Sequence, residues 1–179
     1  MKALVAIANG SEEMEAVIII DTLRRAQWDV TVAGLSETIT ASRGVKIVPD
    51  TVWNQIDPNE FDILLLPGGF GGTEAFMKHV GVQQALRDFN AKGKWIGAIC
   101  AAALALNEAG VLDGRRFTCY PGVEQKLPAN IQPVNEIVVV DDHLITSQGP
   151  GTAFEFALKV IAECGSPNAS QTVRSGLLL

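Results

Sequence analysis

A cysteine stands where an apolar run meets an alanine- and leucine-rich segment. The run Trp95–Ile99 is typical of a buried strand, and Cys100 follows it directly, ahead of a helix predicted over 101–109. A sharp turn between strand and helix lifts a nucleophile above a sheet, and a helix N-terminus favours a thiolate. The segment alone equally allows Cys100 to be a small core residue, so both interpretations stay open at this point.

Two glycines, Gly68 and Gly69, follow a second apolar run, residues 61–66. Glycines at a strand end let backbone N–H groups approach a reacting atom, and with the Ala101 N–H they would form an oxyanion site. Taken alone, the same residues fit a tight turn better. No Gly-Lys-Ser/Thr follows them, so the sequence predicts no phosphate loop.

Three carboxylates, Glu12, Glu13 and Glu15, fall in the first turn of a helix predicted over 12–26, where they suit the helix dipole. Glu15 also adjoins the apolar residues 16–20. Burial there would raise its pKa, and the protonated carboxyl would then hydrogen-bond a nearby thiolate. The residues by themselves favour the plainer interpretation, a solvated helix end.

The remaining titratable groups offer no partner for Cys100. His79 and His143 are predicted to lie at the surface, so no cysteine–histidine hydrolytic pair is expected. Cys119 and Cys164 are interpreted as structural. No group of His, Cys, Asp and Glu has the spacing of metal ligands, and we expect neither a metal nor a cofactor.

The elements that must position these residues alternate along the chain. We expect strands at 3–8, 30–33, 61–66 and 95–99, helices at 12–26, 82–91, 101–109 and 153–164, hairpins at 38–48 and 137–146, and a turn-rich tail from 165. This order predicts an α/β fold with a largely parallel sheet and helices on both faces. Ligands bind beyond the carboxyl ends of such strands, at loops 9–11, 67–72 and 99–101.

Composition excludes several classes of protein. The 179 residues predict one domain, 1–179, and 47% are hydrophobic, too many for disorder. Fourteen basic against twenty acidic residues give a net charge of −6, so we expect no nucleic-acid partner. No apolar run is long enough for a membrane span. Three scattered cysteines and an N-terminus without a leader-like segment predict a cytoplasmic protein.

Five segments together resemble one family. They are residues 8–15 (ANGSEEME), 42–45 (SRGV), 66–69 (LPGG), 98–102 (AICAA) and 146–152 (TSQGPGT). In that order they resemble the ThiJ/PfpI family, and most closely its branch of parkinsonism-associated deglycases and bacterial ThiJ-like proteins. The resemblance extends from residue 4 to about residue 164.

The resemblance implies a flavodoxin-like three-layer sandwich, usually a homodimer. It implies that Cys100 is the family's reactive, easily oxidised elbow cysteine and that Glu15 is its protonated hydrogen-bonding partner, which reverses the plainer interpretation of Glu15. It further implies that Gly69 and Ala101 are backbone oxyanion donors, and that Arg43 lies near the dimer interface and the cysteine pocket.

The sequence departs from the family pattern at three places. Several members carry a histidine before a proline near the cysteine, where this chain has Tyr120, so no histidine base is expected. The protease-like branch has a histidine directly after the cysteine, where this chain has Ala101, so no peptidase activity is expected. The usual proline after Cys-Ala-Ala is Ala103, which favours helix continuation.

These features predict a cofactor-free enzyme of the glyoxalase III or deglycase type, acting on reactive dicarbonyls or early glycation adducts. Cys100 would form a hemithioacetal and Glu15 would shuttle a proton. The alternative is an oxidative-stress sensor or chaperone working through oxidation of Cys100 to sulfinic acid. A thiazole-phosphate biosynthesis role, often attached to this family, lacks a phosphate loop here, and a class I amidotransferase would need a late histidine, for which only His143 is available.

Overall fold

Seven strands form the central sheet, in the spatial order β5-β2-β1-β6-β7-β9-β8. The computed structural model describes residues 1–179. All neighbouring pairs are parallel except β8 and β9. The strands are β1 (Lys2–Ile7), β2 (Asp29–Gly34), β5 (Thr51–Val52), β6 (Ile63–Leu66), β7 (Trp95–Ile99), β8 (Val138–Asp141) and β9 (Leu144–Ser147), and a separate hairpin joins β3 (Ile39–Thr40) to β4 (Lys46–Ile47). The predicted α/β class with a mostly parallel sheet is confirmed.

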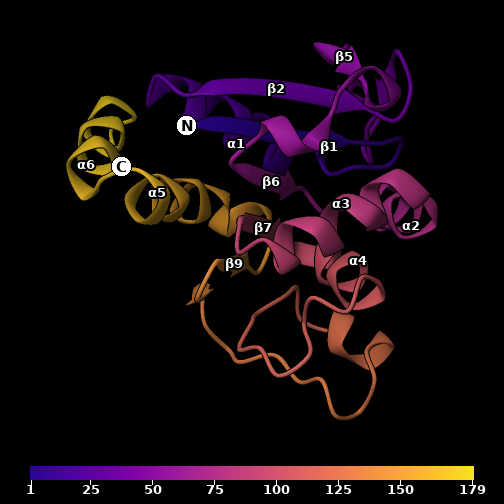
Figure 1. The fold of residues 1–179 in the computed structure, drawn as a ribbon. Helices are drawn as coiled ribbons and strands as arrows, with labels where there is room; N and C mark the ends of the chain where they lie inside the picture. The colour runs from indigo at the N-terminus through magenta and orange to yellow at the C-terminus, as the bar shows by residue number, and fades with distance from the viewer.

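Six helices cover the sheet in two groups. One group is α1 (Glu13–Arg25), α5 (Ala153–Cys164) and α6 (Pro167–Gly176), and the other is α2 (Phe70–Lys78), α3 (Val80–Ala91) and α4 (Ala103–Glu108). Helix α5 packs against both α1 and α6, while α2 packs against both α3 and α4. Figure 1 shows α5 and α6 at the left and α2, α3 and α4 at the right. None of these helices combines the length and apolarity that a bilayer span requires.

The middle of the sheet forms the centre of one hydrophobic core of 50 buried residues. Strands β1 and β6 are buried at almost every position because helices cover both of their faces. This explains why their sequences are nearly continuous apolar runs rather than alternating ones. The strand ends of β1, β6 and β7 are therefore fixed from several sides, and their loops start from rigid points.

Helix α2 corrects the expectation of a simple loop at 67–72. The helix begins at Phe70, although two glycines follow. A Cβ at Gly72 would lie 2.7 Å from the Ser11 Cα, and one at Gly71 would lie 3.2 Å from the Gly10 Cα. The glycines thus let α2 start directly against the loop after β1, and this packing outweighs their poor helix propensity.

The tail from residue 165 is also a correction, since most of it is helix α6. Ser166 caps this helix by accepting a hydrogen bond from the Ala169 N–H at 3.1 Å, and Pro167 occupies its first turn. Both are ordinary helix-start signals. Val173 is the buried residue of α6. The Ser170 hydroxyl donates to the Leu158 carbonyl oxygen at 2.7 Å, which joins α6 to α5.

Candidate active site around Cys100

Three loops meet at the carboxyl ends of β1, β6 and β7, as the parallel order of these strands predicts. The Glu12 N–H donates to the Gly68 carbonyl oxygen at 2.9 Å, joining the loop after β1 to the loop after β6. The Ser42 N–H donates to the Ser11 carbonyl oxygen at 2.9 Å, which joins the β3–β4 hairpin to the loop after β1. Cys100 follows β7 into the same place.

Cys100 occupies a strained turn. Its φ angle is +64°, a left-handed conformation that a residue with a side chain rarely adopts. The chain passes from β7 through a short 3-10 turn, Cys100–Ala102, into α4. The Tyr120 N–H donates to the Cys100 carbonyl oxygen at 3.3 Å and helps to hold the turn. The predicted elbow is present, with the difference that the first turn after β7 is 3-10 rather than α-helical.

Gly68 explains why the loop after β6 approaches this turn so closely. A Cβ at Gly68 would lie 2.6 Å from the Cys100 Cβ and 2.9 Å from the Glu15 Oε2. The Gly68 N–H donates to that same Oε2 at 2.6 Å. No other residue type fits between the cysteine and the carboxylate, so Gly68 holds Glu15 and Cys100 at their close spacing.

Glu15 is fully buried, with 0% of its surface exposed. Burial raises the pKa of its carboxyl from 4.5 to about 7, against the opposing hydrogen bond from the Gly68 N–H. The second carboxyl oxygen, Oε1, is buried and has no hydrogen-bond partner. A carboxyl in this setting can hold or release a proton at neutral pH.

The pKa of the Cys100 thiol is raised to about 12, opposite to the shift expected at a helix N-terminus. Burial is the largest cause, and the negative charge of Glu15 is the next. The backbone N–H groups of Gly69 and Ala101 act in the other direction by hydrogen bonding to the sulfur. Because the charge of Glu15 raises the thiol pKa, a proton on Glu15 makes the thiolate easier to form, and the titrations of the two groups depend on each other.

A cavity of about 270 Å³ opens over the sulfur. Its lining includes five of the residues expected at the site: Arg43, Gly69, Cys100, Ala101 and Tyr120. Glu15 and Gly68 adjoin Cys100 but do not line the cavity. The structure therefore brings every predicted site residue to one place.

Four further residues of the wall were not predicted from the sequence: Glu12, Ser42, Phe70 and Pro150. Glu12, Ser42 and Pro150 belong to segments that carry the family resemblance, and Phe70 directly follows one of these segments. The resemblance is therefore the signal that could have identified them. Phe70 is 55% exposed, although it lines the cavity.

Glu13 holds the Arg43 side of the cavity in place. Its carboxylate accepts hydrogen bonds from the Ser42 hydroxyl and the Arg43 N–H, each at 2.8 Å. These bonds contribute to a lowered pKa of the Glu13 carboxyl, opposing the effect of its own burial. Glu13 was interpreted as a solvated helix end, and that interpretation is wrong because the residue is buried and bonded to the hairpin.

The histidines lie away from the sulfur. His79 is partly buried and accepts a hydrogen bond from the Val82 N–H at the start of α3. The surface prediction for His143 is wrong: it is 8% exposed, with Nδ1 2.8 Å from the Asp142 Oδ2 and Nε2 3.1 Å from the Asn90 Oδ1. Neither histidine lines the Cys100 cavity. No three His, Cys, Asp or Glu side chains lie close enough to hold a metal ion.

Comparison with known proteins decides the family. Residues 1–163 match the sequence profile of the DJ-1/PfpI family. The chain belongs to the DJ-1/PfpI family. This is the ThiJ/PfpI family that the five segments predicted, and the prediction is confirmed.

Members of the DJ-1/PfpI family resemble this chain over nearly its full length. Protein dj-1beta of Drosophila melanogaster is 46% identical over 180 residues, covering 99% of this chain and 96% of the fly protein. The glutathione-independent glyoxalase DJR-1.2 of Caenorhabditis elegans is 34% identical over 171 residues, covering 94% of this chain and 91% of the nematode protein.

Solved DJ-1 structures have the same fold. The crystal structure of Drosophila melanogaster DJ-1beta matches with a TM-score of 0.96 and 45% identity, covering 99% of this chain and 97% of that one. Oxidized Toxoplasma gondii DJ-1 matches with a TM-score of 0.93 and 37% identity, with the same coverage of both chains. The flavodoxin-like arrangement that the resemblance implied is thus confirmed.

Proposed function

We propose that this protein is a cysteine-dependent enzyme that converts small reactive dicarbonyls, or their early adducts on amines, into hydroxy acids without a cofactor. The observation that carries the proposal is the buried pair of Cys100 and Glu15, in which one carboxyl oxygen has no partner. The glyoxalase name of the nematode relative supports the same reaction class.

The first step is attack by the Cys100 sulfur on the aldehyde carbon of the dicarbonyl. The thiol proton passes to Glu15, whose raised pKa makes it a suitable base near neutral pH. A carbon–sulfur bond forms, and the carbonyl electron pair moves to the oxygen. The N–H groups of Gly69 and Ala101 point to this region and stabilise the oxyanion, which then takes the proton from Glu15.

The second step moves one hydrogen between neighbouring carbons. Glu15, ionised again, removes the proton from the carbon bonded to sulfur and returns it to the adjacent carbon. The hemithioacetal thereby becomes a thioester of a hydroxy acid. Water hydrolyses the thioester, releasing the acid and restoring the thiol. The sum is dicarbonyl plus water to hydroxy acid, with no external oxidant or reductant.

The test is consumption of methylglyoxal and formation of lactate by the wild-type protein, by Cys100→Ser and by Glu15→Gln. We expect turnover in the wild type and its loss in both variants, because one removes the nucleophile and the other removes the base. Glu108→Gln, an exposed carboxylate on α4, serves as the matched control and keeps full activity.

Two results would contradict the proposal. Turnover retained by Cys100→Ser would mean that another group attacks the carbonyl. Absence of turnover in wild-type protein whose Cys100 is verified as reduced would exclude the proposed enzyme activity. It would then favour the second candidate function, described next.

A second candidate function is oxidative-stress sensing, with a chaperone role in the oxidised state, through Cys100. Sulfinic oxygens on Cys100 would find donors in the backbone N–H groups of Gly69 and Ala101 and in a protonated Glu15. The solved relative in an oxidized form supports this candidate. Intact mass after mild peroxide is its test: a gain of two oxygens confined to Cys100 supports sensing, and oxygen spread over all three cysteines contradicts it.

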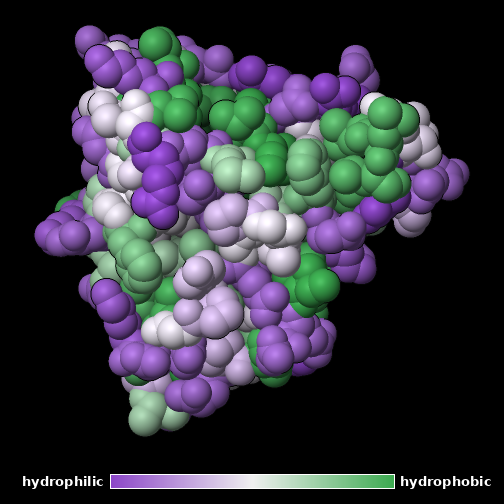
Figure 2. Space-filling model, turned by 180° about the vertical axis from the view of Figure 1, so that it is seen from behind, coloured by the Kyte–Doolittle hydropathy of each residue, from purple (hydrophilic) through white to green (hydrophobic).

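We further propose a homodimer in the cytoplasm. Helix α1 leaves Met14 and Val17 at least half exposed, and Val48 beyond the β3–β4 hairpin is 77% exposed. Figure 2 shows that hydrophobic residues gather in several places on the face of the molecule seen from behind. A second copy would bury such side chains. Light scattering should give twice the chain mass for the wild type and a lower mass for Val17→Lys.

The three free thiols fit a reducing compartment such as the cytoplasm.

A further inference from the structure

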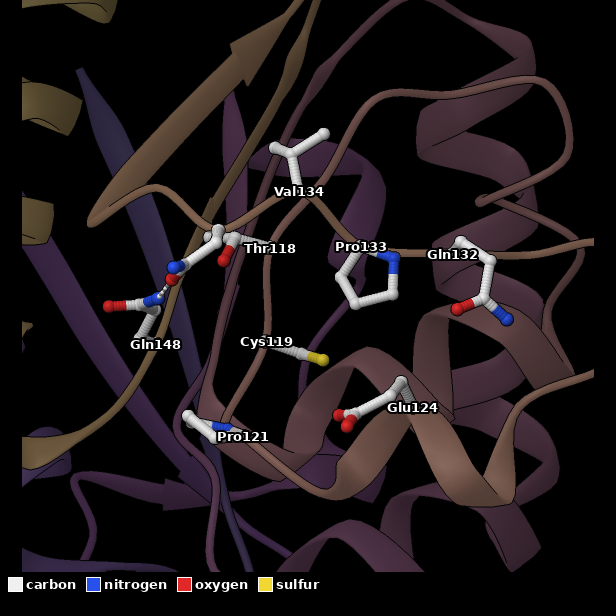
Figure 3. Close-up of a pocket in the computed structure, with 9 residues that line it drawn as sticks. Thr118, Cys119, Pro121, Glu124, Gln132, Pro133, Val134 and Gln148 are labelled. Carbon is white, nitrogen blue, oxygen red and sulfur yellow. Dashed lines mark hydrogen bonds between the residues drawn. The ribbon is translucent and has the colours of Figure 1, made fainter.

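A second cavity, of about 380 Å³, lies beside the active site and plays no part in the mechanism above. It lies between residues 118–124, the loop 132–135 and Gln148. Figure 3 shows the Cys119 sulfur and the Glu124 carboxylate pointing toward the same space. A volume of this size suits a small organic ligand.

Three side chains of this cavity leave acceptor oxygens without a hydrogen bond: Gln148, Gln132 and Glu124. Gln148 Nε2 donates to the Asn135 Oδ1, and Gln132 Nε2 donates to the Ala129 carbonyl oxygen, both at 3.1 Å. Figure 3 shows the Gln132 oxygen on the side that faces the other lining residues. The Glu124 carboxylate uses Oε2 to accept from the Gly122 N–H at 2.7 Å, which leaves its Oε1 available.

A buried hydroxyl adds to the unmet hydrogen-bonding capacity. Thr118 is 1% exposed, and its Oγ1 has no partner. Figure 3 shows this oxygen directed to the side of Thr118 on which Cys119 lies. A buried polar atom without a partner is costly unless a ligand or solvent satisfies it. The hydroxyl therefore marks, beside this cavity, a hydrogen bond that the chain itself does not supply.

Charge narrows the class of occupant. Glu124 is the single charged residue of the lining, and no lysine, arginine or histidine lines the cavity. An anion would find no counter-charge, whereas a planar cation with several N–H groups would meet the carboxylate and the amide oxygen together. Guanidinium carries five such donors and no acceptor. We propose that this cavity binds the guanidinium group of a small ligand or of an exposed arginine side chain.

The cavity is separate from the Cys100 cavity but shares a wall with it. Tyr120 lines the active site, while its neighbours Cys119 and Pro121 line the second cavity. The Tyr120 ring lies against Gly149, where an added Cβ would be 3.0 Å from the ring. The guanidinium site is thus distinct from the position at which Cys100 attacks a carbonyl, and the proposal does not depend on the proposed enzyme activity.

Calorimetric titration of the full chain tests this site. The probes are free L-arginine, N-acetyl-L-arginine amide, and N-acetyl-L-citrulline amide, whose side chain has nearly the same shape without charge. We expect the arginine amide to bind at least tenfold more tightly than the citrulline amide. Tighter binding of free arginine would identify a free amino acid as the source, and tighter binding of the amide would identify a protein side chain.

Two variants locate the binding. Glu124→Gln keeps the size of the side chain and an oxygen for the Gly122 N–H, and it should abolish the preference for arginine over citrulline. Glu108→Gln removes an exposed carboxylate elsewhere and should leave the preference unchanged. Equal affinity for the two amides, an unchanged preference in Glu124→Gln, or no binding of either arginine probe would each overturn the proposal. Cooperative thermal unfolding of both variants confirms that they are folded.

Discussion

The molecule holds two pairs of a buried cysteine and a glutamate, and they differ in almost everything except residue type. Cys100 adopts a left-handed backbone conformation, whereas Cys119 does not. Glu15 is completely buried, whereas Glu124 is partly exposed. Burial raises the pKa of both thiols, to about 12 and about 11 respectively. Thiol pKa alone therefore does not distinguish the two sites.

The difference lies in what each pair can do with a proton and a developing charge. Glu15 has a pKa of about 7 and a buried carboxyl oxygen without a partner, so it can accept the Cys100 proton. Two backbone N–H groups, from Gly69 and Ala101, lie beside Cys100 and can stabilise a negative charge there. At Cys119 the corresponding hydrogen bond comes from the Glu124 N–H alone. Proximity of thiol and carboxylate is thus insufficient for nucleophilic chemistry, and burial of the acid and paired donors are the added requirement.

The largest effect should come from removing the close approach that only the Cys100 site has. Gly68→Ala places a Cβ 2.6 Å from the Cys100 Cβ and 2.9 Å from the Glu15 Oε2, so the pair must separate. A misplacement of this kind lowers kcat/KM by about 100-fold. Steady-state methylglyoxal kinetics measure the loss. Gly151→Ala is the control, because nothing lies within 4 Å of its added Cβ; an equal loss there would sink this account of Gly68.

The next effect concerns the stability cost of the buried carboxyl. The pKa of Glu15 in the folded protein, about 7, exceeds the ordinary value of 4.5. The protonated carboxyl therefore contributes stability that is fully present below pH 4.5 and is lost as the pH rises through 7. Glu15→Gln cannot ionise, so it does not lose stability in this way. We expect the difference in unfolding free energy between Glu15→Gln and wild type to rise by about 3 kcal/mol between pH 4.5 and pH 8.

Urea unfolding at a series of pH values measures that difference. Glu108→Gln, which is exposed, should show no such trend. A difference that stays constant with pH would mean that Glu15 is not the group that titrates near neutrality.

A smaller effect distinguishes the two thiols directly. If thiol pKa governed reactivity, Cys119 would react first, since its pKa is about 11 against about 12 for Cys100. The base and the paired N–H donors instead predict that Cys100 is alkylated about tenfold faster. Peptide mapping after brief iodoacetamide treatment at pH 8 measures both rates. Faster modification of Cys119 would show that the thiol pKa, rather than the proton acceptor, controls the reactivity of the sulfur.

The smallest effect is expected at the second pair. Cys119→Ser should change turnover of methylglyoxal by less than about twofold, because Cys119 does not line the Cys100 cavity. The same assay with Glu124→Gln should give the same result. A large fall in either variant would show that the wall between the cavities transmits changes to the active site.

Much of the site could be predicted because it depends on the ends of buried parallel strands. The apolar runs of β6 and β7 locate Gly68 and Cys100 at the same edge of the sheet, and the loops after them must then meet. Glu15 is different. Its residue type and helix position alone favoured solvent, and only the family resemblance indicated burial, because burial depends on how α1 packs over the strand ends.

The features that were missed depend on contacts between distant residues. His143 is buried and contacts Asn90, which lies 53 positions earlier in the chain, so no local pattern reveals its position. Helix α2 begins among glycines because the loop after β1 touches it. The cavity of Cys119 and Glu124 is closed by residues 132–135 and Gln148, whose proximity follows from the path of an irregular loop rather than from periodicity.

The wall between the two cavities has a consequence for spectroscopy. Tyr120 is the only tyrosine of the chain, and its ring faces the active site from a position directly next to the lining of the second cavity. A fluorine-labelled tyrosine would therefore give one resonance, free of overlap, from a single known position. Chemistry at Cys100 and occupancy beside Cys119 would each shift that resonance, so one nucleus reports on both halves of the comparison.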